Sequence, residues 1–289
     1  MRTRFAPAPT GYLHLGHVVN ALYVWGVARA AGGRVLLRIE DHDRQRSRAG
    51  YERAIREDLD WLGFVADEDG GRQSERGAIY EAALAGLRAH GLVYACECSR
   101  ADVDSALLAG SASRRIYPGT CRSKSLAEVA GLGVRVRLEP SVERFDDLCH
   151  GPQEQRPWEQ SGDLLARDRD GNWTYQFAVT VDDLQQGVTH VIRGDDLLDS
   201  TGRQLQLARL LGRERPPLFL HHPLVMKSAT QKLSKADHDT SVRDLRAAGR
   251  PAADVIGEAA RLANLIDRDR PVAAAEAAAL VGNCRRSIA

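Results

Sequence analysis

The start of the chain reads as a strand, a loop, a helix and a second strand, and this order constrains the fold more than any other feature. The segment 3–7 (TRFAP) predicts a short strand, and an apolar helical pattern follows over 16–29. Gly32 and Gly33 end that helix, and 34–39 (RVLLRI) predicts a second, buried strand. Strands that are connected through a helix pair in parallel, so the sequence predicts an α/β fold.

Beyond the second strand, the alternation of helices and strands continues to about residue 95. Helical patterns surround Ile55 and Leu59 and then cover about 80–90. The run 92–96 (LVYAC) is typical of a buried strand, and we expect it to continue the parallel sheet. A stretch rich in Ser, Arg, Gly and Pro then interrupts the pattern, which indicates an inserted module.

The α/β pattern resumes after this module. We expect 174–183 (TYQFAVTVDD) and 188–194 (VTHVIRG) to form strands or strand ends, 200–212 to form a helix and 217–225 (PLFLHHPLV) to form the last strand. The predicted fold is therefore α/β, with a Rossmann-like, doubly wound parallel sheet. The expected division is 1–95 for the first half of the Rossmann-like domain, 96–156 for the inserted module, 157–239 for the second half and 240–289 for a short segment of Ala-rich helices.

Composition excludes several classes of protein. The 289 residues carry a formal net charge of +1, so the chain is not a polycation that binds nucleic acid without specificity. No apolar run approaches the ~20 residues that cross a bilayer, and the N-terminus has no apolar core of a signal peptide. We therefore expect a cytoplasmic protein that does not bind membranes. The sequence gives no indication of its oligomeric state.

Two histidines bracket a glycine at the first strand-to-helix junction. His14, Gly16 and His17 stand where the unpaired N–H groups and the positive end of a helix dipole come together. Such a junction binds phosphate readily, and the imidazoles add hydrogen-bond donors. The alternative is that both histidines are polar loop residues without a ligand.

Lysine is rare in this chain, and two of its lysines lie close together after the last predicted strand. Lys232 and Lys235 flank Leu-Ser, whereas most other cations are arginine. Two flexible ammonium groups in one loop suit a polyphosphate and its leaving group. The alternative is an ordinary solvated loop.

Three of the five cysteines cluster in the predicted module. Cys96, Cys98 and Cys121 have the residue type that zinc prefers, and in a reducing compartment they favour a metal site over disulfides. Tetrahedral zinc needs a fourth ligand, for which Cys149 or His150 is one source. The alternative is a set of buried thiols without a metal.

Together, the His-x-Gly-His string and the Lys-x-Ser-Lys loop resemble the two motifs of the class I aminoacyl-tRNA synthetases. Four further strings resemble the glutamyl-specific branch of that family in sequence and order: RFAPAPTG at 4–11, RIEDHD at 38–43, YQFAVTVDD at 175–183 and GVTHVIRG at 187–194. The resemblance covers residues 2 to about 245. It implies that the Rossmann-like domain is catalytic, that it binds ATP with Mg²⁺, and that its amino acid is L-glutamate.

The resemblance also implies roles for individual residues. The catalytic residues on the ATP phosphates are His14, His17, Lys232 and Lys235, and Gly16 belongs to the ATP site. The glutamate site comprises Arg4 and Arg193 for carboxylates, Glu40 for the ammonium, Tyr175 as a hydroxyl and a wall, and Ala6 and Ala8. Ala8 departs from the family, which usually has Ser there, and this removes a hydroxyl near the amino acid. Ala236 also departs, where Ser or Arg is frequent.

In the glutamyl branch, a Cys-x-Cys pair followed by Tyr-x-x-x-Cys holds a structural zinc. The same spacing here implies the ligands Cys96, Cys98, Tyr117 and Cys121. The ordinary pKa of a phenol is about 10, so only a metal's charge makes its anion routine at neutral pH.

About fifty residues follow Lys235, fewer than the long anticodon-binding region of a full glutamyl-tRNA synthetase needs. We therefore expect no anticodon-binding domain. The resemblance then favours a short branch that activates glutamate without tRNA and transfers it to the queuosine base of tRNA(Asp). The alternatives are a truncated synthetase that charges the 3′ end of tRNA(Glu), a nucleotidylyltransferase that makes a different adenylate, and a non-catalytic nucleotide-binding regulator.

Overall fold

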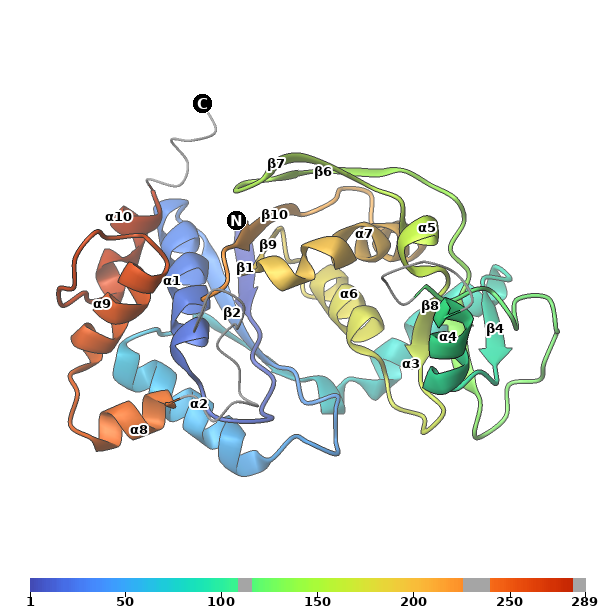
Figure 1. Cartoon of the computed structure of the whole chain (residues 1–289), viewed down its shortest axis with the longest axis horizontal. Helices are drawn as coiled ribbons and strands as arrows, with labels where there is room; N and C mark the ends of the chain where they lie inside the picture. Colours follow the sequence, from blue (N-terminus) through green and yellow to red (C-terminus); the bar gives the residue numbers. More distant parts are fainter. Residues whose placement is uncertain (109–115, 226–239, 283–289) are drawn as a thin grey trace.

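Parallel strands and the helices that connect them form the centre of the molecule (Figure 1). The computed structural model describes residues 1–108, 116–225 and 240–282. The strands are β1 (Arg2–Phe5), β2 (Arg34–Ile39), β3 (Glu68–Arg72), β4 (Val93–Cys96), β5 (Gly133–Val136), β6 (Glu143–Asp147), β7 (Gly151–Gln155), β8 (Leu164–Arg167), β9 (His190–Gly194) and β10 (Leu218–His222). The helices are α1 (Leu15–Ala30), α2 (Ala49–Leu62), α3 (Gly77–Ala89), α4 (Arg100–Leu108), α5 (Pro157–Ser161), α6 (Tyr175–Gln185), α7 (Thr201–Leu210), α8 (Val242–Ala247), α9 (Ala252–Leu262) and α10 (Ala277–Val281), with short 3-10 helices η1 (Gln73–Glu75), η2 (Asp195–Ser200) and η4 (Ala274–Glu276). Within these ranges, every helix is too short or too polar to cross a bilayer.

The strands that carry the predicted site run in one direction. β1, β2 and β3 form a parallel sheet, and β9 pairs in parallel with β10. β1 lies beside β9, because the N–H of Thr189 donates to the carbonyl of Arg2 at 2.9 Å and Arg4 reaches the carbonyl of Ile192 at 3.2 Å. The predicted α/β fold with a parallel sheet is therefore confirmed. The carboxyl ends of these strands meet at one edge, where such folds bind their ligands.

Helix α1 lies between the parallel strands and the C-terminal helices and is apolar on nearly every side. Its residues from Val18 to Ala28 are buried, with the exception of Asn20. It contacts β1, β2 and β9 as well as α9 and α10, which cover it at one end of the molecule (Figure 1). Gly26 permits a close approach, since a Cβ there would lie 2.7 Å from the carbonyl oxygen of Ala277. A helix between two layers needs no polar face, which explains the unbroken apolar pattern.

The segment 174–183 forms helix α6, so the prediction of a strand there is wrong. Every residue from Phe177 to Asp183 is buried, and a helix that is buried on all sides shows no amphipathic period. Its β-branched, apolar residues also suit a strand when judged locally. Tertiary contacts decide the outcome, because Phe177 and Val181 enter a core cluster and Asp183 faces buried arginines.

Strand β4 does not continue the parallel sheet, in contrast to the prediction. It pairs antiparallel with β5, and β5 pairs antiparallel with β8, in a separate sheet (Figure 1). This sheet combines β5, which lies inside the segment 96–156, with β4 and β8, which lie at or beyond its limits. The hairpin β6–β7 lies inside that segment, but β6 pairs with β10 of the Rossmann-like part. The domain division at residues 96 and 156 remains a prediction.

One carboxyl group is buried on the side of α2 that faces α8. Asp58 is 2% exposed, and its Oδ2 atom has no hydrogen-bond partner among the described residues. Burial raises the pKa of Asp58 to about 6 from 3.8, although the guanidinium of Arg246 opposes this. Between about pH 4 and pH 6, the folded chain therefore binds a proton here that the unfolded chain releases. The free energy of unfolding consequently falls as the pH rises through this interval.

Replacing Asp58 with Asn should remove this dependence. We expect the free energy of unfolding of Asp58→Asn, relative to wild type, to rise by about 1–3 kcal/mol between pH 4 and pH 7. Urea denaturation at a series of pH values measures the difference. The control is Asp60→Asn on the exposed side of the same helix, whose difference should stay constant. A constant difference for Asp58→Asn as well would contradict this account.

Candidate active site and metal centre

The loop between β1 and α1 ends in a histidine cap. Nδ1 of His14 accepts a hydrogen bond from the N–H of Gly16, and Nδ1 of His17 accepts one from the N–H of His14, both at 3.1 Å. Because both Nδ1 atoms accept, each neutral ring carries its proton on Nε2. A Cβ on Gly16 would lie 2.9 Å from the His14 ring, so a side chain there would displace the cap. Both histidines thus lie at the N-terminus of α1 and cap its first turn.

The predicted lysines, Lys232 and Lys235, lie outside the described residues. The chain on both sides of this segment is held against α1 and its preceding loop. Before it, Nε2 of His222 lies 3.2 Å from Oδ1 of Asn20 in α1. After it, the N–H of Val242 donates to the carbonyl of Leu13 at 2.8 Å. The described chain on either side of the segment therefore contacts α1 or the loop before it.

Two arginines from neighbouring strands share one carboxylate from α6. Nε of Arg4 donates to both oxygens of Asp183 at 3.0 and 3.2 Å, and Nη1 of Arg38 donates to Oδ1 at 2.8 Å. Nη2 of Arg38 also donates to Oε1 of Glu40 at 2.9 Å. Burial raises the pKa of Asp183, but the two guanidiniums outweigh it and hold that pKa below its usual range. The ionised carboxylate fixes both arginines near the carboxyl edge of the sheet.

Among the described residues, Arg193, at the end of β9, donates hydrogen bonds to neutral groups. Nε donates to Nε2 of His221 at 2.9 Å, Nη1 to Oε1 of Gln204 at 2.7 Å and Nη2 to Oγ1 of Thr201 at 2.9 Å. The residue is 4% exposed, and burial lowers its pKa. A buried guanidinium without a close carboxylate is costly, so this position suits an anionic ligand.

Tyr175 lies at the start of α6, close to the same charges. Burial raises the pKa of Tyr175 and the carboxylate of Glu40 adds to this effect, whereas Arg193 and Arg4 act in the opposite direction. The charges of Arg4, Arg193 and Glu40 therefore all act on the Tyr175 hydroxyl. These are the four ionisable residues that the sequence predicts to bind glutamate.

The loop after β1 is tied to the end of β2. The carbonyl of Pro7 accepts a hydrogen bond from the N–H of Glu40 at 3.0 Å, and Ala6 and Ala8 flank this proline, both half-buried. The carbonyl of Ala8 accepts from the N–H of Thr10 at 2.9 Å, which closes a turn. The two alanines thus lie in a loop that is bonded to the backbone of Glu40, the residue expected to take the ammonium.

Sequence analysis did not identify Arg38, Asp183 or His221 as members of this group. Arg38 and Asp183 stand inside the strings that carry the family resemblance, and His221 stands inside the apolar run of β10. An ionisable residue in an otherwise apolar run needs a buried partner, and this was the available signal. The identity of each partner depends on contacts between distant segments, which no local pattern contains.

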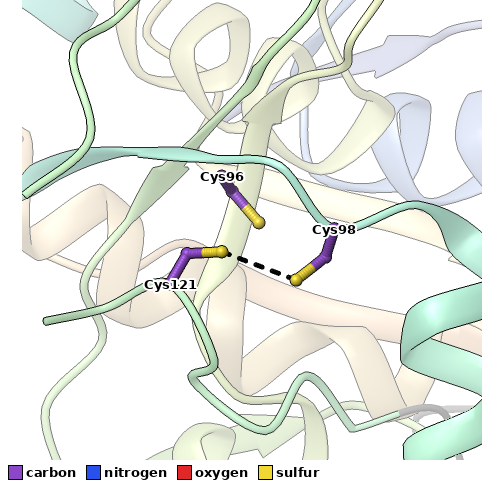
Figure 2. A group of neighbouring side chains, drawn as sticks. All are labelled: Cys96, Cys98 and Cys121. Atoms are coloured by element: carbon purple, nitrogen blue, oxygen red, sulfur yellow. Dashed lines mark hydrogen bonds between the residues drawn. The ribbon is translucent and has the colours of Figure 1, made fainter. Parts of the chain in front are cut away.

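The three predicted cysteines converge between β4 and the loop that holds Cys121. The sulfur atoms of Cys96, Cys98 and Cys121 all lie within 4.8 Å of one another, and Sγ of Cys98 and Cys121 are 3.5 Å apart (Figure 2). Sulfur ligands on one tetrahedral zinc, with Zn–S of about 2.3 Å, are about 3.8 Å apart. The cluster therefore has the size and donor set that a thiophilic metal ion requires.

The hydroxyl of Tyr117 lies against this cluster. It accepts a hydrogen bond from the N–H of Cys121 at 2.9 Å and lies 3.4 Å from Sγ of Cys96. The guanidinium of Arg135 stacks on the Tyr117 ring at 3.5 Å from its centroid, and Nε of Arg135 donates to Sγ of Cys96 at 3.3 Å. Burial raises the pKa of Cys96, but the hydrogen bonds from Tyr117 and Arg135 bring it below the ordinary thiol value. A cation already lies beside the sulfur and the phenol, which suits a negatively charged set of ligands.

The alternative ligands, Cys149 and His150, lie elsewhere in the molecule. Cys149 packs against the core around α1, and Nε2 of His150 lies 2.7 Å from Oδ1 of Asp195. Among the described residues, neither belongs to the group of sulfur atoms that could share an ion. Tyr117 is therefore better placed than either residue to complete the site.

A cavity of about 560 Å³ lies between Tyr175 and the cysteine cluster. Its lining contains three arginines and three aspartates, with aromatic groups between them. The residues that matter for its chemistry are Asp43, Arg46, Cys98, Arg100, Arg169, Trp173 and Tyr175. The volume suits a small organic group or a nucleoside rather than a single ion.

Comparison with known proteins places these features in a family. Residues 1–276 match the model of the tRNA synthetases class I (E and Q), catalytic domain. A Glutamyl-Q tRNA(Asp) synthetase of Nitratidesulfovibrio vulgaris is 41% identical over 285 residues, which cover 92% of this chain and 87% of that protein. A protein of the same name from Rhodobacter capsulatus is 40% identical and covers 88% of this chain and 98% of its own length.

A solved structure has the same fold. The crystal structure of a glutamate tRNA ligase from Elizabethkingia meningosepticum, in complex with its amino acid, superposes with a TM-score of 0.78 at 28% identity. The match covers 96% of this chain and 64% of that one, so the chain spans less than two thirds of the ligase. The Rossmann-like fold expected from the sequence is thus shared with a glutamate enzyme of known structure.

The geometry of the cysteine cluster predicts that the protein binds a metal ion. We expect the wild-type protein to bind about one Co²⁺ per chain, with thiolate-to-cobalt absorption in the near ultraviolet, and Cys121→Ala to lose both. Cys149→Ala is the matched control and should retain both, because Cys149 packs in another core. Equal loss in the two variants would contradict the assignment.

Proposed function

The chain belongs to the class I tRNA synthetases for glutamate and glutamine, and from this premise we propose that it activates L-glutamate with ATP, without tRNA, and transfers it to the queuosine base of tRNA(Asp). It is a ligase of the aminoacyl-tRNA synthetase type. Its relatives named Glutamyl-Q tRNA(Asp) synthetase, at 40–43% identity over most of the chain, support the choice of acceptor.

The charge of Arg193 is the observation that carries the proposal. This buried guanidinium donates its hydrogen bonds to neutral groups of the described chain, while the charges of Arg4, Glu40 and Arg193 all act on Tyr175. Glutamate brings two carboxylates and one ammonium. Its carboxylates pair with Arg4 and Arg193, its ammonium pairs with Glu40, and Tyr175 closes one wall.

Activation needs no covalent intermediate on the enzyme. An α-carboxylate oxygen of glutamate attacks the α-phosphorus of ATP, the bond to the β-phosphate oxygen breaks, and pyrophosphate leaves with its charge. His14 and His17 and the N-terminus of α1 face the phosphates, and Lys232 and Lys235 follow the charge on the leaving group. Mg²⁺ enters with ATP and is held mainly by phosphate and water.

Transfer joins the two substrates. A hydroxyl of the cyclopentenediol of queuosine attacks the carbonyl carbon of glutamyl-adenylate and an ester bond forms. AMP leaves with the bonding electron pair, and the hydroxyl proton passes to solvent. The cavity between Tyr175 and Cys98 is the acceptor site in this proposal. Arg46, Arg100 and Arg169 on its walls suit the phosphates of an anticodon arm.

We assign the metal of the cysteine cluster as zinc, with Cys96, Cys98, Tyr117 and Cys121 as its ligands. Zinc binds thiolates in a tetrahedron and has no redox chemistry, so its role here is structural. It would hold the loop around Cys121 on β4, at one wall of the cavity. The Arg135 guanidinium offsets part of the negative charge of these ligands.

Pyrophosphate exchange without RNA tests the proposed function. We expect exchange of labelled pyrophosphate into ATP with L-glutamate and not with aspartate or glutamine. Lys235→Ala should reduce the rate by about 100-fold or more, since it removes a charge that stabilises the transition state.

Exchange that appears only after addition of tRNA(Glu) would favour a truncated synthetase. If no amino acid supports exchange under any condition, the result would favour a non-catalytic nucleotide-binding regulator. Attachment of glutamate to tRNA(Asp) that lacks queuosine would contradict the proposal that queuosine is the acceptor.

Glu40→Gln tests the ammonium site. We expect the KM for glutamate to rise by about tenfold or more, because a hydrogen bond to a charged group contributes about 1.5–3 kcal/mol. The control is Glu57→Gln on α2, whose side chain is 60% exposed. An unchanged KM in Glu40→Gln, or an equal change in the control, would count against this role.

A further inference from the structure

The carboxylate of Asp147, at the end of β6, is buried and has three backbone N–H groups and one imidazole as hydrogen-bond partners. Asp147 is 2% exposed, and Oδ1 accepts from the N–H groups of Cys149 at 2.9 Å and His150 at 3.1 Å. Oδ2 accepts from the N–H of His221 at 3.1 Å and lies 2.6 Å from Nδ1 of the same residue. The carboxylate is thus fixed on three backbone groups and directed at one imidazole.

This contact determines which nitrogen of His221 carries the proton. An ionised carboxylate only accepts, so Nδ1 of His221 donates to Asp147. Nε2 then has a lone pair, and it accepts the Nε–H of Arg193 at 2.9 Å. The ring is fully buried and stacks on Phe219, and burial lowers its pKa, which agrees with a neutral imidazole.

The chain Asp147–His221–Arg193 fixes the direction of the guanidinium without neutralising it. Gln204 and Thr201 hold Nη1 and Nη2, and both of these partners are neutral as well. A carboxylate in place of His221 would also hold the arginine, but it would compete with the substrate for the positive charge. A neutral imidazole avoids this competition.

We propose that Asp147 and His221 are positioning residues that orient Arg193 toward a substrate carboxylate while leaving its charge available. The inference rests on the proposed function, because it takes glutamate as the ligand of Arg193. It also gives the β6–β7 hairpin a role in the amino-acid site, through Asp147 at the end of β6.

Two substitutions of His221 separate the two hydrogen bonds. In His221→Gln, the amide oxygen can reach the position of Nε2 and accept from Arg193, whereas His221→Asn has its amide near the position of Nδ1 and cannot. In pyrophosphate exchange, we expect His221→Asn to raise the KM for glutamate by about tenfold or more with kcat within a few-fold of wild type. His221→Gln should recover most of this loss. His90→Asn, at the exposed end of α3, is the control and should match wild type.

Equal increases of KM in His221→Gln and His221→Asn, or an unchanged KM in His221→Asn, would overturn the proposal. Nitrogen-15 NMR of the histidines in the wild-type protein gives a second readout that needs no variant. We expect the shifts of His221 to show a neutral ring with the proton on Nδ1, and a proton on Nε2 would overturn the proposal. Absence of glutamate-dependent exchange in the wild type would instead refute the proposed function, and the NMR result would still test the orientation of His221.

Discussion

The carboxylate of Asp183 is the point on which the amino-acid site depends. It joins β1 and β2 through Arg4 and Arg38, and it comes from α6, more than a hundred residues later in the chain. Taking such charges out of water is costly, and only close pairing offsets this cost. Removal of one partner from a buried ion pair typically destabilises a protein by about 3–5 kcal/mol, because the remaining charge is left uncompensated. The fold and the site therefore share the same contacts.

The two arginines expected to meet carboxylates differ in how their charge is balanced. Arg4 is paired with Asp183, whereas Arg193 donates its hydrogen bonds to neutral partners among the described residues. The first arrangement stabilises the sheet, and the second leaves positive charge for a ligand. Since these groups are held before the substrate arrives, little conformational entropy remains to be lost on binding. The site is thus rigid where it is internally paired and attractive to anions where it is not.

The sequence predicted the parts of the site that lie at ends of strands and starts of helices. The histidine pair and the cysteine cluster are local patterns, whereas Glu40 follows from the family resemblance. The structure brings the three cysteines together as expected. The error at 174–183 has a physical cause, because a fully buried helix shows no amphipathic period. The partners Asp183 and His221 could not be predicted, since their roles arise from contacts between segments far apart in the sequence. The pairing of strand β4 also depends on distant segments. Its apolar run fits either a parallel or an antiparallel neighbour, so the sequence pattern alone did not give the correct sheet.

A crystal structure of the protein with L-glutamate and a non-hydrolysable ATP analogue tests the central claim most directly. That claim is that a group of prearranged charges recognises both carboxylates and the ammonium of glutamate. We predict one carboxylate at Arg193, the other at Arg4 and the ammonium within hydrogen-bond distance of Glu40, with the three side chains where they lie now. Glutamate bound elsewhere, or an Arg193 that turns away from His221 and leaves the ligand, would contradict the account.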